Sequence, residues 1–133
     1  MTGMIVNIDV PDLDAAVSFY TAAIGLKLAR LLDDDVAELT GASCPIFLLM
    51  RPEGVSPALG VTRTREYVRH WSPIHLDFVV DALEHAVKRA IDAGAMQETG
   101  IVLWRGSRCV TFSDPFGHGF CLIEFAQDTY SGD

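Results

Sequence analysis

Hydrophobic and polar residues alternate over residues 5–10, and this period of two predicts a β-strand with two different faces. One face carries Ile5, Asn7 and Asp9, and the other carries Val6, Ile8 and Val10. The first set mixes an apolar side chain with two polar ones, whereas the second is entirely aliphatic.

A helical stripe follows this strand. Asp12 is a favourable N-cap, and Pro11 before it resists continuing the strand. Gly25 is the expected C-terminal stop, so the pattern predicts a helix of about three turns that buries one face. The apolar residues at helical spacing are Leu13, Ala16, Val17, Tyr20 and Ile24.

Three further apolar runs, at residues 27–32, 36–39 and 45–50, predict three more strands. Turn residues separate them at 33–35 and 41–43. The first part of the chain is therefore predicted to be a βαβββ unit.

The second part of the chain repeats this plan. Asp81 follows Asp12 at an offset of 69, and Leu83 follows Leu13 at an offset of 70. A strand is predicted over 74–80, followed by a helix that Asp81 caps and Gly94 ends. The helix is expected to bury Leu83, Ala86, Val87, Ala90 and Ile91. Further strands are predicted at 101–105, 108–113 and 119–125.

A repeat of this length indicates two duplicated supersecondary units. The predicted fold class is α+β, with two βαβββ modules forming a curved mixed sheet around a cavity. We expect a first module at 1–51, an inter-module linker at 52–73, a second module at 74–126 and a C-terminal tail at 127–133. Whether the modules pair within one chain or swap between chains stays open.

Composition narrows the classes of function. Ten Lys and Arg against 18 Asp and Glu give a net charge of −8, which repels phosphate backbones, so we expect no nucleic-acid partner. The longest apolar stretch, Ile46–Met50, is too short to span a bilayer, so we expect no membrane partner. The first ten residues show no leader pattern, and three widely spaced cysteines suggest reduced thiols, so a cytoplasmic location is expected. No Gly-rich phosphate loop, nucleophile elbow or paired-cysteine zinc motif occurs.

Three segments together resemble the vicinal oxygen chelate superfamily, which includes glyoxalase I, extradiol dioxygenases, and fosfomycin and bleomycin resistance proteins. VPDLDAAVSFYTAAIGL is similar to the opening of its first module, and HLDFVVDALEHAVKRAIDAGA to the start of its second. DPFGHGFCLIEF is similar to its closing turn and strand. The resemblance implies paired modules around a U-shaped cavity and, in the metal-dependent members, a divalent ion held at four inward positions.

Carried over to this chain, those four positions fall on Ile5, Phe47, His75 and Cys121. Ile5 and Phe47 have no donor atom, whereas such an ion needs imidazole or oxygen ligands. A shifted register would offer Asn7, Asp9 or Asp77 instead, although Asp9 and Asp77 lie toward the strand ends. We therefore expect no cofactor, and a divalent metal is the less favoured alternative.

The candidate ligand-binding residues combine apolar and polar side chains, which is typical of a pocket for organic molecules. His75 is either a ligand contact or acid–base group, tuned by a neighbouring carboxylate, or a hydrogen-bonded relic of a metal site. Cys121 is expected to line the pocket as a small apolar residue. The candidates are His75, Phe47, Ile5, Asn7, Asp77, Cys121, Leu49 and Trp104.

The tryptophans and the linker leave alternatives open. Trp71 and Trp104 could stack on a flat ligand, or they could pack in the core or at a dimer contact. The run of Arg63, Arg65, Tyr67 and Arg69 could clamp an anionic group, or it could be a solvated loop.

Three functions compete. The preferred one is a small-molecule-binding protein of the glyoxalase and bleomycin resistance type, without the family metal site. The alternatives are a metal-dependent glyoxalase- or dioxygenase-like enzyme and a pure interaction module. Because superfamily members are often dimeric and sheet edges need covering, we also expect a homodimer.

Overall fold

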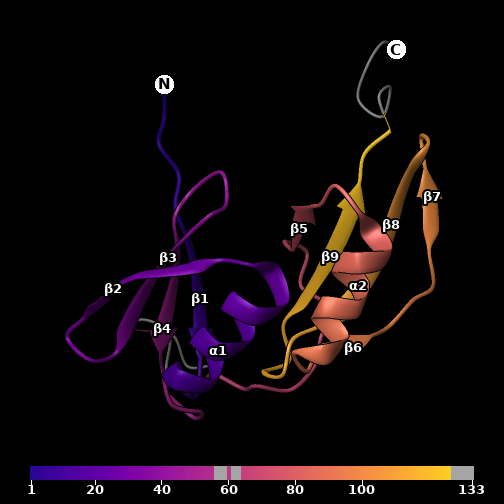
Figure 1. Cartoon of the computed structure of the whole chain (residues 1–133). Helices are drawn as coiled ribbons and strands as arrows, with labels where there is room; N and C mark the ends of the chain where they lie inside the picture. Colours follow the sequence, from indigo (N-terminus) through magenta and orange to yellow (C-terminus); the bar gives the residue numbers. More distant parts are fainter. Residues whose placement is uncertain (56–59, 61–63, 127–133) are drawn as a thin grey trace. The chain divides into compact units, whose positions relative to one another are not determined.

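The computed structural model describes residues 1–55, 60 and 64–126, and it shows an α+β protein. The described residues form two helices and nine strands, arranged in two open, mixed sheets. The chain divides into two compact units, Met1–Val68 and Arg69–Asp133, each with one helix lying on one face of its own sheet (Figure 1). The division between Val68 and Arg69 falls inside the segment 52–73 expected as a linker. The expected tail at 127–133 and Arg63 lie outside the described residues.

The first unit has a four-stranded sheet in the order β1-β4-β3-β2. Strand β1 pairs in parallel with β4, and the other pairs are antiparallel. The elements are β1 (Val6–Val10), α1 (Leu13–Ile24), β2 (Lys27–Leu32), β3 (Val36–Thr40) and β4 (Ile46–Met50). The βαβββ order predicted for this unit is confirmed.

Helix α1 begins and ends as its sequence predicts. Asp12 Oδ1 accepts a hydrogen bond from Ala15 N at 3.0 Å, which satisfies one of the unpaired N–H groups of the first turn. Gly25 has φ 82°, a left-handed conformation that ends the helix at little steric cost.

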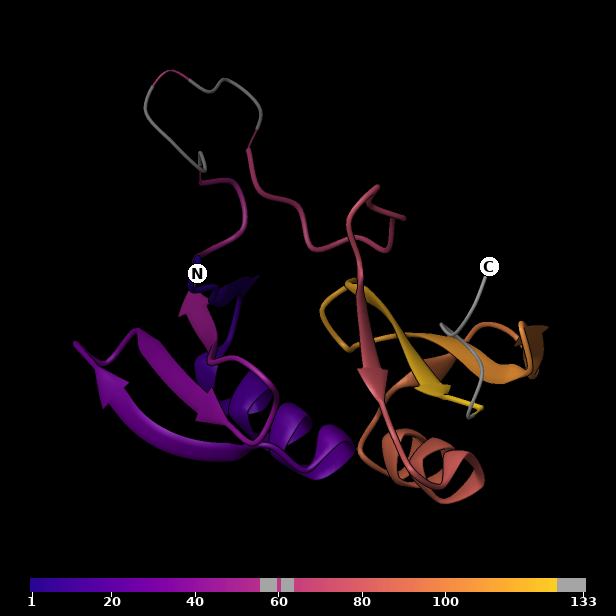
Figure 2. The same ribbon diagram turned by 90° about the horizontal axis from the view of Figure 1, so that it is seen from above.

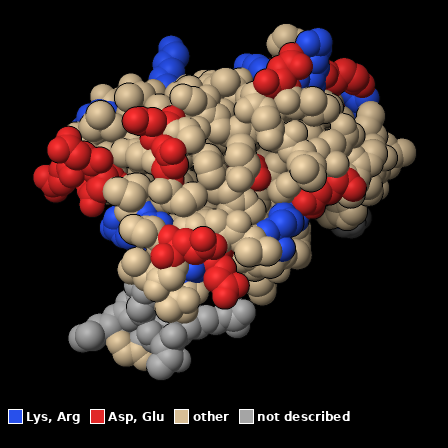
Figure 3. Space-filling model, turned by 90° about the horizontal axis from the view of Figure 1, so that it is seen from below, with Lys and Arg blue, Asp and Glu red and all other residues tan. Residues whose placement is uncertain are grey.

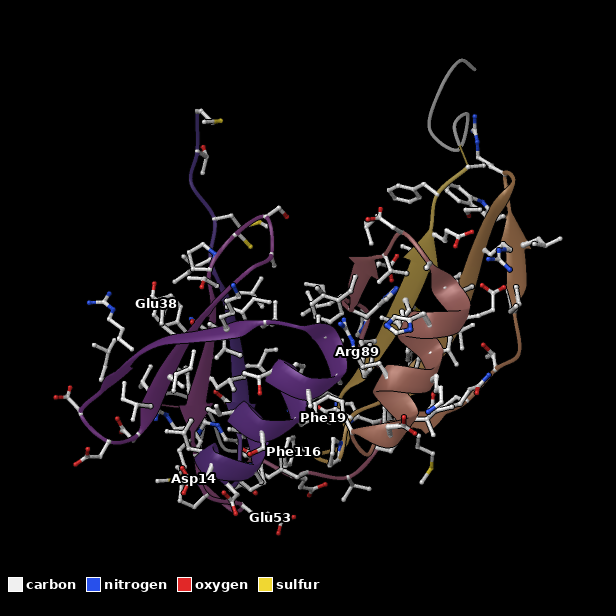
Figure 4. All side chains as sticks on the ribbon, in the orientation of Figure 1. Asp14, Phe19, Glu38, Glu53, Arg89 and Phe116 are labelled. Atoms are coloured by element: carbon white, nitrogen blue, oxygen red, sulfur yellow. The ribbon has the colours of Figure 1, made fainter. Side chains whose placement is uncertain are left out.

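The core of the first unit lies between α1 and one face of the sheet. Helix α1 contributes Ala16, Phe19, Tyr20 and Ala23, and the sheet contributes Val10, Ala37, Leu39, Ile46 and Leu48. Phe19 and Ala23 extend the buried stripe beyond the predicted set. Burying a side chain as large as Phe19 stabilises the fold by roughly 1.5–3 kcal/mol. On the other side of the sheet Glu38 points away from α1, where Phe19 lies (Figure 4).

The second unit has a five-stranded sheet in the order β5-β9-β8-β6, with β7 also paired to β8. Figure 2 shows α2 lying on one side of β8 and β9. The elements are β5 (Leu76–Val79), α2 (Leu83–Asp92), β6 (Met96–Gln97), β7 (Val102–Trp104), β8 (Ser107–Ser113) and β9 (Gly119–Glu124). The short strand β6 was not predicted, and β5 is shorter than the predicted 74–80.

Helix α2 begins differently from the sequence-based prediction. Its N-cap is Ala82 rather than Asp81, and no side chain of the cap residue accepts a hydrogen bond. Glu124 of β9 takes over this role, since its carboxylate accepts the N–H of Leu83 at 2.9 Å. Ile91 was expected to be buried, but it is 45% exposed, because the buried stripe of α2 consists of Leu83, Ala86 and Ala90.

The turn before β9 has a clear physical cause. Asp114 is buried, and its Oδ1 accepts hydrogen bonds from Phe116 N at 2.8 Å and His118 N at 2.9 Å. Gly117 then has φ 91°, which a residue with a Cβ rarely adopts. The sequence Asp-Pro-Phe-Gly therefore closes a tight turn that aligns β9 beside β8.

On the face shown in Figure 3, acidic side chains lie in several separate patches, and basic side chains lie beside some of them. Neither helix of the described residues is long and apolar enough to cross a bilayer.

Candidate functional site

The candidate site lies in the second unit, on the sheet face turned away from α2. Asp77 of β5 is paired with Cys121 of β9, and Cys121 is paired with Thr111 of β8. Paired residues share a face of a sheet, so these side chains form a row across three strands. Phe112, Phe120 and Leu122 lie on the opposite face, in the core with α2.

His75, directly before β5, joins this row. Its Nε2 lies 3.2 Å from Asp77 Oδ1, and the side chains of His75 and Asp77 are 35% and 42% exposed. A proton on Nε2 would donate to the carboxylate, so this contact favours that tautomer. The predicted pairing of His75 with a neighbouring carboxylate is therefore present, and both groups are open to a ligand.

Cys121 is the buried member of the row. Its Sγ lies 3.4 Å from Thr111 Oγ1, and burial raises its pKa to about 12. Burial also raises the pKa of Cys109, which lies two residues from Thr111 on β8. Both groups are therefore neutral thiols near neutral pH, which suits pocket lining and not nucleophilic attack.

Trp71 lies against the same face, at the end of the sheet near His75. The centroids of the Trp71 and His75 rings are 4.7 Å apart. A Cβ placed on Gly119 would lie 2.6 Å from Trp71 Cζ3 and 2.7 Å from Arg69 Nη2, so both side chains lie directly over the Gly119 backbone. Trp71 was predicted as a possible stacking residue but not as a site residue. No local sequence pattern indicates that Trp71 packs on Gly119.

The structure places Trp104 elsewhere on the second unit. Trp104 is paired with Ser107, whereas Gly119 is paired with Ser113. These positions are six residues apart along β8, which is roughly 20 Å at about 3.3 Å per residue. Trp104 and His75 therefore lie toward different ends of the sheet.

The corresponding face of the first unit carries three of the other candidates, Asn7, Phe47 and Leu49, together with Asp9. Asn7 is paired with Phe47, and Asp9 is paired with Leu49, so these four residues share the face turned away from α1. Ile5 lies directly before β1 and is exposed. Whether this face and the His75 face enclose one cavity stays a prediction.

One polar group of the first unit already has an internal partner. Arg65 Nε lies 2.5 Å from Asp9 Oδ2, and only 13% of the Arg65 side chain is exposed. Tyr67 donates its hydroxyl proton to Arg51 O at 2.6 Å, and burial raises its pKa. The linker arginine Arg65 is thus held by a carboxylate of its own chain and contributes to the fold of this unit.

The described residues supply only some of the ligands that a divalent ion requires. His75, Asp77 and Cys121 each offer one ligand atom, and these atoms lie within 4.8 Å of one another. Three such ligands on one sheet face are one fewer than the four that the inherited site supplies. Ile5 and Phe47, the inherited positions of the first module, are hydrocarbons. The residues present therefore do not fit the four-ligand site that the resemblance implies.

Comparison with known proteins now decides the family. A model of the glyoxalase-like domain matches residues 5–123, nearly the whole chain. The chain belongs to the glyoxalase-like domain family. The resemblance to the vicinal oxygen chelate superfamily is confirmed by this match. A search of curated proteins finds no match for this glyoxalase-like domain.

Solved structures agree on the fold. The fosfomycin resistance protein FosX from Listeria monocytogenes aligns with a TM-score of 0.74 at 13% identity, over 98% of this chain and 99% of that one. Lactoylglutathione lyase from Agrobacterium tumefaciens aligns with a TM-score of 0.64 at 20% identity, over 92% of each chain. A glyoxalase/bleomycin resistance protein/dioxygenase from Nocardioides aligns with a TM-score of 0.68 at 20% identity, over 100% of this chain and 89% of that one. At such identities the likeness shows the fold alone.

Proposed function

We propose that this glyoxalase-like domain binds a small organic molecule and does so without the family metal. The observation that carries the proposal is the row of His75, Asp77 and Cys121 on the sheet face turned away from α2. It combines two accessible polar groups with a buried thiol that behaves as an apolar surface.

The proposed site has polar groups that can orient a ligand and apolar groups that can desolvate it. In the second unit these are His75 and Asp77 beside Cys121. In the first unit we include Asn7, Phe47 and Leu49, with Ile5 before β1, on the corresponding face. Trp104 remains a proposed contact only for a ligand long enough to reach the β7 end of the sheet.

The test is a compound screen by thermal shift on the purified protein, followed by titration of hits against His75→Ala and Phe47→Ala. We expect a hit with a large apolar part, and we expect His75→Ala to weaken it. Each lost contact should reduce affinity several-fold, since a typical hydrogen bond contributes about 1 kcal/mol. If both variants keep full affinity for every hit, the proposed site is wrong.

Metal analysis of the native protein tests the second half of the proposal. We expect no stoichiometric divalent metal, because Ile5 and Phe47 offer no donor. Stoichiometric zinc, nickel, iron or manganese that disappears in His75→Ala would contradict this expectation.

The alternative function is a metal-dependent glyoxalase- or dioxygenase-like enzyme. The proximity of the His75, Asp77 and Cys121 ligand atoms favours it. FosX and lactoylglutathione lyase, whose folds are similar, carry names of resistance and lyase functions. The metal measurement separates this alternative from metal-free binding.

We also infer a homodimer in the cytoplasm. Among the described residues strand β7 pairs with β8 alone, and its residues Val102, Leu103 and Trp104 are exposed, so this edge needs covering. Light scattering that shows a monomer at micromolar concentration would contradict the dimer.

A further inference from the structure

We propose that Trp71 is a specificity-determining residue of the His75 site, and that it selects a planar, conjugated ligand with a positively charged nitrogen. The inference rests on the proposed function, because it concerns a ligand of the same site. It adds the chemical class of that ligand and the residue that recognises its shape.

Trp71 packs against Gly119 and His75. Gly119, on β9 two residues before Cys121, has no side chain, and the indole occupies the space that a Cβ would need. His75 flanks the indole at 4.7 Å between ring centroids. Trp71 nevertheless keeps 49% of its surface exposed, so it presents an aromatic surface beside the His75–Asp77 pair.

Arg69 fixes the chain next to Trp71. Its Nε and Nη2 donate to the two carboxylate oxygens of Glu98 at 2.5 and 2.7 Å, and Nη1 donates to His70 O. Such a two-point contact holds the guanidinium in one orientation. The guanidinium carbon lies 5.1 Å from the centroid of the Trp71 ring, so this ring already interacts with one planar cation.

The charges around Trp71 favour a cation. Arg69 and Glu98 neutralise each other, while Asp77 contacts His75, whose imidazole carries no charge when it is unprotonated. The face of the Trp71 ring also carries partial negative charge, so Asp77 and Trp71 both attract positive charge. An anionic ligand would be repelled by Asp77 and by the net charge of −8.

Shape provides the second constraint. A flat ring that carries a charged nitrogen can stack on the exposed part of the indole and pair with Asp77, whereas a globular group offers no flat surface for stacking. We therefore expect fused aromatic cations to bind more tightly than flat anions or globular cations.

The experiment measures dissociation constants by isothermal titration calorimetry for four probes: 9-aminoacridine, a planar cation; acridone, planar and neutral; anthracene-9-carboxylate, planar and anionic; and 1-adamantanamine, a globular cation. We expect 9-aminoacridine to bind at least about tenfold more tightly than anthracene-9-carboxylate and 1-adamantanamine, since a cation–π contact and an ion pair are worth roughly this factor. Asp77→Asn should weaken the binding of 9-aminoacridine more than that of acridone, because only 9-aminoacridine loses an ion pair.

Variants test the role of Trp71. Trp71→Leu should lose about tenfold in affinity for 9-aminoacridine, while Trp71→Phe keeps most of it, because Phe retains a stacking face. Gly119→Ala should reproduce the loss by displacing the indole. The matched control is Gly100→Ala, since a Cβ at Gly100 meets nothing within 4 Å. Equal affinity of 9-aminoacridine for wild type, Trp71→Leu and Gly119→Ala would overturn the inference.

A broad thermal-shift library separates this inference from the proposed function. If globular or anionic compounds bind in a His75-dependent way and planar cations do not, the inference is wrong and the proposed function stands. If no compound in the library or among the four probes binds, the proposed function fails, and the inference fails with it.

Discussion

Glu124, the last residue of β9, accepts the backbone N–H of Leu83, the first residue of α2, at 2.9 Å. A residue 41 positions away thus does what an N-cap side chain normally does. Arg108 contacts the same carboxylate at 2.9 Å and also pairs with Glu84 in the first turn of α2. The start of α2 is therefore fastened to the sheet by one carboxylate and one guanidinium.

The first prediction concerns the pH dependence of this link. The hydrogen bond from Leu83 and the contact with Arg108 hold the pKa of Glu124 below its usual value, and Arg108 lowers that of Glu84 to about 2. Groups with lowered pKa values stabilise the folded state above their unfolded pKa of about 4.5 and lose that effect as the pH falls. We expect Glu124→Gln to lower the melting temperature at pH 7, and the difference from wild type to shrink below about pH 4.5.

Thermal unfolding followed by circular dichroism between pH 7 and pH 3 checks this. Glu66→Gln is the control, because Glu66 is exposed and is not the acceptor of a helix N–H among the described residues, and it should leave the melting temperature unchanged. A difference between Glu124→Gln and wild type that stays constant down to pH 3 would show that the charge of Glu124 plays no part.

The second prediction compares the two helix starts. Asp12 caps α1 by its side chain, whereas Asp81 makes no cap to α2. Asp12→Ala should lower the free energy of unfolding by about 1 kcal/mol. Asp81→Ala should change it by less than about 0.5 kcal/mol. Urea denaturation measures both, and a loss at Asp81 as large as that at Asp12 would contradict the assigned caps.

The comparison of caps shows how far the sequence carries the fold. Alternation and helical spacing predict βαβββ twice, because those patterns depend on neighbouring residues. Asp81 was predicted as the N-cap because it precedes an apolar stripe. The N-cap is instead Ala82, one residue later, and the carboxylate of Glu124 accepts the N–H of the first turn. No local pattern predicts a partner so distant in the sequence.

For the candidate site too, the sequence predicted contacts between near neighbours and missed contacts between distant residues. The pairing of His75 with Asp77 follows from strand alternation and is present. The seat of Trp71 over Gly119 depends on the path of residues 69–75 across β9, which is a tertiary property. From the sequence, Trp104 is as good a candidate for stacking on a ligand as Trp71. The pairing of β7 with β8 shows that Trp104 lies toward the other end of the sheet.

The third prediction concerns thiol reactivity. A thiol with a pKa of about 12, such as that of Cys121, is ionised to roughly one part in ten thousand at pH 8. We expect iodoacetamide at pH 8 to modify Cys121 far more slowly in the folded protein than in urea. Peptide mass spectrometry over time measures the modification, and Cys44 in the same sample is the internal control. Modification of folded Cys121 at the rate of a free thiol would show an activated cysteine and would favour a catalytic role.

The last prediction tests whether the two modules share one cavity. If they do, donors restored at the inherited positions of the first module should join His75 and Cys121 around one ion. We expect Ile5→His combined with Phe47→Glu to bind about one equivalent of Co²⁺, since three or four nitrogen, oxygen and sulfur ligands make a stable site. The visible absorption of Co²⁺ during titration reports the binding, and wild type should show none at the same concentration. Adding His75→Ala to the double variant should abolish binding, which separates a shared site from one made by the new residues alone. If the double variant gains no affinity while its melting temperature stays close to that of wild type, the modules do not place these four positions around a common centre, and the predicted shared cavity is wrong.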